Sequence, residues 1–95
     1  KSAGVVDMSF IEGQIVTGDF DREMNVFSLK TIKQFHTQTS LNESQLRALQ
    51  QYLEQHEHEE DGQIVTLYDQ MLVPLSQKDI KALLADLTKV QSLYQ

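Results

Sequence analysis

The clearest hydrophobic pattern lies at the C-terminal end of the chain. From about Gln77 onwards, apolar residues recur every three or four positions, which is the period of one face of an α-helix. A weaker stripe with the same period runs from about Glu43 to His58. We therefore expect two amphipathic helices, the second with the broader apolar face. The stripe of the second helix consists of Ile80, Leu83, Leu84, Leu87, Val90 and Tyr94.

The same capping pattern begins both predicted helices. Asn42 and Ser76 can accept hydrogen bonds from the free amides of a first helical turn. Gln45 and Asp79 follow three residues later, where their side chains can reach back to the amide of the cap. A leucine precedes each cap and an apolar residue follows it, as in a hydrophobic staple. The pattern therefore places the two helix starts next to residues 42 and 76.

Two short stretches of the chain echo each other. Besides the helix starts, Gly13–Thr17 and Gly62–Thr66 share the sequence Gly-Gln-Ile-Val-Thr, which is typical of a strand that follows a glycine. One interpretation is an internal duplication, with related halves at residues 8–61 and 62–95. The other is independent convergence on good start sequences.

β-branched and aromatic residues before the first helix predict strands. We expect one strand up to Thr17, an acidic turn over residues 18–23, and a return strand over residues 24–32. Residues 28–38 can also be drawn as a helix, but their β-branched side chains favour a strand.

The segment between the two helices contains further strand sequence. Ile64–Tyr68 predicts one strand, and Met71–Val73 either continues it past a bulge or turns back as another. The resulting order, ββαβ(β)α, predicts an α+β fold: a small antiparallel sheet of three or four strands with two helices packed on one face. We expect residues 8–95 to form a single domain, preceded by residues 1–7 as a disordered leader or cloning remnant.

Composition and charge exclude several classes of protein. The chain has 14 acidic and eight basic residues, and a net charge of −6 repels a phosphate backbone, so we expect no nucleic-acid partner. The absence of cysteine excludes disulfides, zinc–thiolate sites and thiol nucleophiles. The apolar runs are far shorter than the roughly 20 residues of a membrane-spanning helix. We expect a soluble, cytoplasmic protein with no membrane partner.

A dense polar cluster occupies Glu54–Asp61. It contains His56 and His58, but residues two apart point to different sides of a helix, whereas helical metal ligands are spaced by three or four. We favour a solvated helix end over a metal site, with these two histidines as weak candidate ligands.

Acidic side chains at the C-terminal end of a helix oppose the helix dipole, so helix stability does not explain their presence. A basic surface on a partner protein would explain them, and simple solubility of an exposed loop is the alternative. The acidic candidates for partner binding are Glu57, Glu59, Glu60 and Asp61.

Three apolar or aromatic residues are further candidates for partner contacts. Phe20 falls in the predicted acidic turn, where its ring either folds into the core or stays exposed as a contact residue. Leu93 and Tyr94 lie on a wide apolar arc that a small sheet need not cover. They are candidates for a homodimer formed through the C-terminal helix, or for a partner's groove.

No motif in the sequence indicates catalysis. A glycine-rich phosphate loop and a G-x-S-x-G elbow are absent, so we expect neither catalytic activity nor a cofactor. The leading hypothesis is a small acidic protein–protein interaction module, such as an inhibitor, adaptor or regulatory subunit. The alternatives are a homo-oligomeric structural protein and a metal-dependent protein that uses the cluster at His56–Asp61.

Overall fold

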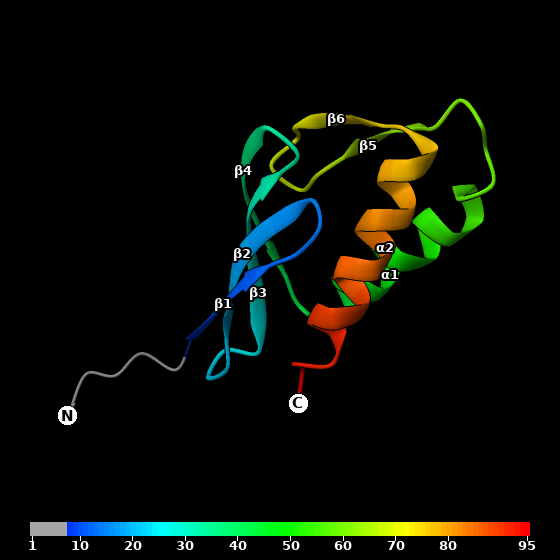
Figure 1. Cartoon of the computed structure of the whole chain (residues 1–95). Coiled ribbons are helices and arrows are strands. Elements are labelled where there is room, and N and C mark those ends of the chain that lie inside the picture. Colours follow the sequence, from blue (N-terminus) through cyan, green and yellow to red (C-terminus); the bar gives the residue numbers. More distant parts are fainter. Residues whose placement is uncertain (1–7) are drawn as a thin grey trace.

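The computed structural model describes residues 8–95, so the prediction for residues 1–7 lies outside the described residues. The elements follow one another in the order ββββαββα (Figure 1). They are β1 (Met8–Glu12), β2 (Val16–Asp21), β3 (Val26–Ile32), β4 (Phe35–Leu41), α1 (Glu43–His56), β5 (Gln63–Thr66), β6 (Leu72–Leu75) and α2 (Gln77–Gln91).

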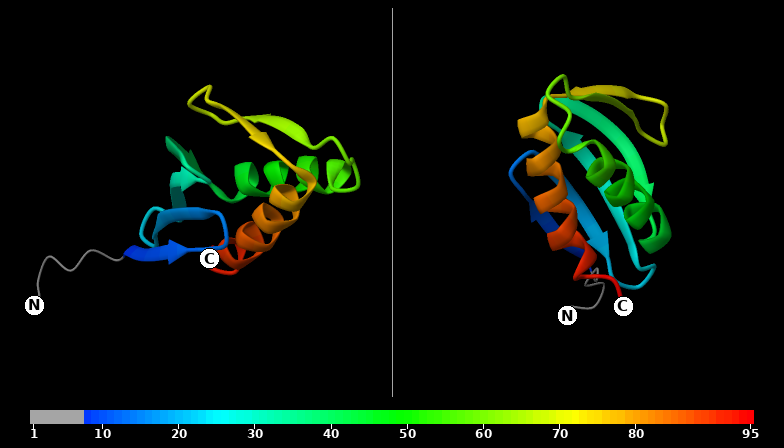
Figure 2. Two further views of the ribbon diagram at one scale, coloured as in Figure 1. Left: turned by 45° about the horizontal axis from the view of Figure 1, so that its top comes forward. Right: turned by 90° about the vertical axis from the view of Figure 1, so that its right-hand side faces the viewer.

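The first four strands form an antiparallel sheet in the order β1-β2-β3-β4, and both helices cover the same face of it (Figure 2). This confirms the predicted α+β class and the position of the helices. Strands β5 and β6 pair with each other as a separate two-stranded sheet. Of the two interpretations of Met71–Val73, the returning strand is therefore the correct one.

The N-terminal half contains more strands than predicted, because its turns lie elsewhere. Residues 18–21, expected in a turn, belong to β2, and the chain reverses after Asp21. The Asp21 carboxylate accepts hydrogen bonds from the amides of Glu23 and Met24, and Asn25 adopts a left-handed φ of 59°. These short-range bonds close a turn that begins at residue 22, four residues after Gly18, where the turn was expected to begin.

Gly18 serves close packing instead of a turn. A Cβ atom built on it would lie 2.3 Å from the carbonyl oxygen of Ser28 and 2.7 Å from the ring of Phe27. The register of β2 against β3 shifts at this point. The glycine is needed because the neighbouring strand and its aromatic ring approach the backbone so closely.

Residues 28–38 form strands, as their β-branched side chains predicted, but a tight turn divides them into β3 and β4. Lys33 occupies this turn with a φ of 57°. A left-handed lysine carries no sequence signature comparable to glycine or asparagine, which is why the turn was not predicted.

Both predicted capping boxes are present. Asn42 Oδ1 accepts a hydrogen bond from the Gln45 amide at 2.8 Å, and Ser76 Oγ accepts one from the Asp79 amide at 3.1 Å. The reciprocal bonds to the cap amides are 2.8 Å and 3.0 Å long. Helix α1 ends at His56, two residues before the predicted end, and neither helix in residues 8–95 has the length and apolar composition needed to span a membrane.

A buried carboxylate joins α2 to the sheet. Asp86 is fully buried among the apolar residues of α2, and its oxygens accept hydrogen bonds from the amides of Gln14, Ile15 and Val16 at 2.8 Å, 2.9 Å and 3.2 Å. A Cβ atom on Gly13 would lie 2.4 Å from this carboxylate, so the β1–β2 turn requires glycine there. The carboxylate supplies the acceptors that the turn amides would otherwise lack in the interior.

We predict that Asp86→Ala lowers the free energy of unfolding by about 3 kcal/mol, because it leaves three turn amides without a partner. Urea denaturation followed by circular dichroism measures this change. Glu12→Ala, at an exposed position of β1, is the control and should change stability by less than about 0.5 kcal/mol. An Asp86→Ala protein as stable as the control would contradict the anchoring role.

Candidate functional site

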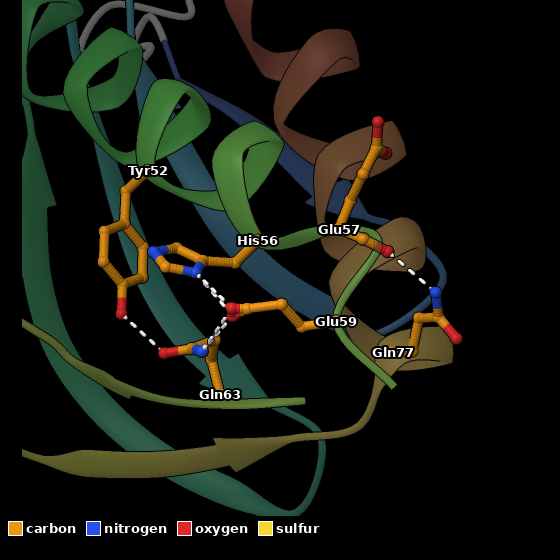
Figure 3. Close-up of polar contacts among 6 residues, drawn as sticks. All are labelled: Tyr52, His56, Glu57, Glu59, Gln63 and Gln77. Atoms are coloured by element: carbon orange, nitrogen blue, oxygen red, sulfur yellow. Dashed lines mark hydrogen bonds and ion pairs between the residues drawn. The ribbon is translucent and has the colours of Figure 1, made fainter. Parts of the chain in front are cut away.

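The polar cluster after α1 is folded back on itself. His56 Nδ1 lies 2.8 Å from both carboxylate oxygens of Glu59, and Gln63 Nε2 donates to Glu59 Oε1 at 2.7 Å (Figure 3). The Tyr52 hydroxyl donates to Gln63 Oε1 at 2.9 Å. Across the loop, Gln77 Nε2 donates to the backbone carbonyl of Glu57 at 3.0 Å. The loop from residue 57 to residue 62 is thus tied to α1, β5 and α2.

Glu59 holds this loop together through its bonds to His56 and Gln63. The hydrogen bond from His56 lowers the pKa of its carboxyl group below the ordinary value, although partial desolvation opposes the shift. Glu60 and Asp61 are exposed, and Glu57 is half-buried with its carboxylate 3.8 Å from His58 Nε2. The four predicted acids share one loop, in which Glu60 and Asp61 are exposed and Glu57 and Glu59 are partly buried.

The two candidate metal ligands are not brought together. The His56 ring is engaged by Glu59, whereas the His58 side chain is 88% exposed. Within residues 8–95, no three histidine or carboxylate side chains are placed so that they could hold a metal ion. The geometry of the described residues therefore gives the metal hypothesis no support.

Phe20 lies in the core, and not at the tip of an exposed turn. Its side chain is 0% exposed, because residue 20 lies on the inward face of β2 and not at a turn. Its ring packs edge-on against Tyr94, with 4.9 Å between the ring centroids. Phe20 is a core residue in this fold, and the prediction that it contacts a partner is wrong.

The two C-terminal candidates also serve the fold. Tyr94 is half-buried and its hydroxyl donates to the carbonyl of Leu41 at 2.6 Å, at the end of β4. Leu93 is partly buried and packs against the core. The apolar arc at the end of α2 is therefore largely covered by the first half of the chain, which sequence periodicity alone could not show.

The net charge of the protein comes from one segment. Residues 48–77 contain six acidic residues and neither lysine nor arginine, and the remainder of the chain has eight acidic and eight basic residues. Two of the six carboxylates are used within the fold. Glu59 binds His56, and Asp69 accepts hydrogen bonds from the Thr37 hydroxyl at 2.6 Å and the Gln38 amide at 3.1 Å. The remaining four are Glu54, Glu57, Glu60 and Asp61.

The outer face of the β5–β6 hairpin is apolar, a feature that the sequence analysis missed. Ile64 is 62% exposed, Leu72 is 60% exposed, and Tyr68 beside them is 57% exposed. Val65 and Val73 point to the opposite face and are buried. A strand that carries apolar residues on both faces is typical of a fully covered sheet, yet this hairpin is covered on one face only. The sequence indicates this exposed apolar face only through consecutive apolar residues such as Ile64 and Val65, which must point to opposite faces of a strand.

A groove runs between α1 and β5, next to this apolar face. One part has a volume of about 230 Å³, and an adjoining part of about 150 Å³ lies towards the end of β5. Leu49 and Thr66 line both parts. The other lining residues are Tyr52, Ile64 and Val65 in the first part, and Leu41, Ala48, Leu67 and Tyr68 in the second.

The chain matches no protein-family model, no curated protein and no solved structure. Any functional interpretation therefore depends on the surface described above.

Tyr94 generates a prediction about alkaline pH. Burial raises the pKa of its hydroxyl to about 12, so the folded protein keeps this proton over a range, above about pH 10, in which the unfolded chain loses it. This contribution to stability is complete below pH 10 and disappears as the pH rises to about 12.

We predict that Tyr94→Phe costs about 1 kcal/mol of stability at neutral pH, because the bond to Leu41 is lost. The variant should also lose less stability than the wild type between pH 10 and pH 12. Urea denaturation at a series of pH values measures both effects. Parallel stability curves for the two proteins would show that Tyr94 does not titrate in this way.

Proposed function

We propose that the protein is a small, non-catalytic interaction module that binds a basic partner protein through residues 48–77. The observation that carries the proposal is the coincidence, in one segment, of the whole net charge and the largest exposed apolar side chains of the second sheet. Apolar contact area surrounded by charge of one sign is typical of a surface that selects partners of the opposite charge. We further propose that the protein acts in the cytoplasm, as expected from the sequence.

Structural restraint of the loop supports this proposal. Glu59, Gln63 and Gln77 fix the loop that carries Glu60 and Asp61. A surface that is already ordered loses less conformational entropy when a partner binds. The exposed acids are therefore displayed on a fixed frame next to the apolar face.

Self-association through the C-terminal residues is the weaker alternative. Tyr94 already packs on Phe20 and bonds to Leu41, so its ring and hydroxyl are used within one molecule. Homodimer formation through α2 remains a prediction that light scattering at high protein concentration can test.

We predict that Glu60→Lys combined with Asp61→Lys abolishes partner recovery, with at least a tenfold loss, which corresponds to about 1.4 kcal/mol. The test is affinity purification from the source cell, with quantitative mass spectrometry of the recovered proteins. Neither side chain takes part in the hydrogen bonds that hold the loop, so the variant should fold normally.

The matched control is Glu12→Lys combined with Glu23→Lys, which makes the same change in net charge at exposed positions of β1 and of the β2–β3 turn. It should recover the same partners as the wild type. Equal loss with both double variants would indicate a general charge effect, and no loss with either would refute the proposed binding surface.

A further inference from the structure

Strand β5 has one unpaired edge. The Leu67 amide donates to the Met71 carbonyl at 2.9 Å, and Val65 is the register partner of Val73. In an antiparallel ladder the residues alternate, so the backbone groups of Ile64 and Thr66 point away from β6. No strand in the described part of the chain pairs with this edge.

The two edges of the hairpin differ. On β6, Pro74 lacks an amide hydrogen, and its carbonyl accepts a hydrogen bond from Lys33 Nζ at 3.4 Å. Lys33 is itself held by Asp79, 2.7 Å away, and the hydrogen bond from Lys33 lowers the pKa of that carboxyl group. A proline and a lysine are the residues that proteins use to block an exposed edge. The β5 edge has neither.

The free edge faces the groove beside α1. Tyr52 of α1 bonds to Gln63 at the start of β5, and Figure 3 shows β5 between this helix and β6. The groove is lined by Leu49 and Tyr52 on the helix side and by Ile64 and Thr66 on the strand side. An added strand would therefore find backbone hydrogen-bonding groups and apolar contacts at the same place.

The charge around the edge decides which occupant fits. Glu59, Glu60 and Asp61 precede β5, Asp69 follows it, and residues 48–77 contain neither lysine nor arginine. A second copy of the chain, paired antiparallel through its own β5, would bring the acidic loop of each molecule towards Asp69 of the other. Repulsion between like charges disfavours that arrangement and favours a basic occupant.

We infer that β5 binds an extended segment of a partner protein, in which basic and apolar residues alternate, as a third strand of the β5–β6 sheet. The inference rests on the proposed function. Alternate apolar side chains of the segment enter the groove against Leu49, and the basic side chains between them remain in solvent near Glu60 and Asp61.

The probe is a fluorescent, end-capped peptide of four Lys-Val repeats, and binding is measured by anisotropy. We expect saturable binding to the wild-type protein, at least tenfold weaker binding of a peptide in which the lysines and valines form two separate blocks, and no dimer by light scattering. Failure of the alternating peptide to bind, equal binding of the block peptide, or a dimer of the protein alone that Thr66→Pro dissociates would each overturn the inference.

The Thr66 amide points away from β6, so Thr66→Pro removes a donor that an added strand would use and leaves the bonds to β6 intact. We expect this variant to bind the alternating peptide at least tenfold more weakly. Thr66→Val keeps the amide and should bind within about twofold of the wild type. Unchanged binding by the proline variant would overturn strand addition.

Methylated peptides test the same point on the unaltered protein. One peptide carries N-methyl groups on its lysine amides and the other on its valine amides. Since only alternate amides of an added strand face β5, we expect one of these peptides to bind normally and the other to fail. Equal behaviour of the two peptides would overturn the inference.

The outcomes separate this inference from the proposed function. If the Glu60→Lys, Asp61→Lys protein loses its cellular partners while Thr66→Pro keeps them, the acidic surface is correct and strand addition is wrong. If both proteins keep their partners, the proposed function fails as well.

Discussion

The hydrogen bonds of the Asp86 carboxylate determine how the two halves of the structure are joined. A buried carboxylate is costly unless its oxygens are satisfied, and three consecutive amides of the β1–β2 turn satisfy it. This requirement places α2 against the start of β2, about seventy residues away in sequence. Helix α1 packs beside α2 on the same face of the sheet, and the hairpin that connects the two helices extends beyond the sheet (Figure 2).

The position of the hairpin explains its exposed face. Its inner residues, among them Val65 and Val73, complete the core between the helices and the sheet. Nothing in the described residues covers the outer side chains of Ile64 and Leu72. Asp69 fixes the tip of the hairpin to β4 through Thr37 and Gln38, so the exposed face keeps its place. A rigid apolar face left open on a small protein is a surface suited to binding.

Local chemistry predicted the helices well, because capping depends on residues a few positions apart. The capping boxes at Asn42 and Ser76 could be found without any tertiary information. The turns were harder. Asn25 and Lys33 adopt left-handed conformations that the surrounding strands impose, and Gly18 indicated a turn although close packing requires it. The duplication of the two halves stays a hypothesis, since shared caps arise by local chemistry alone.

The candidate site was only partly predictable. The acidic loop could be read from the chain, but burial of Phe20 and Tyr94 depends on contacts between distant segments. Asp86 left one clue, a charged residue on the same helical stripe as Leu83 and Val90. Such a residue is either solvated at the margin of the stripe or satisfied inside, and periodicity cannot distinguish these cases.

The segregation of charge has a second physical consequence. An exposed apolar strand edge is prone to pair with its own copy, which leads to aggregation. Residues 48–77 carry six acidic residues and neither lysine nor arginine, so any such self-pairing brings like charges together. A basic segment experiences attraction at the same place. The edge of β5 can therefore stay open because the acids around it select against the chain itself.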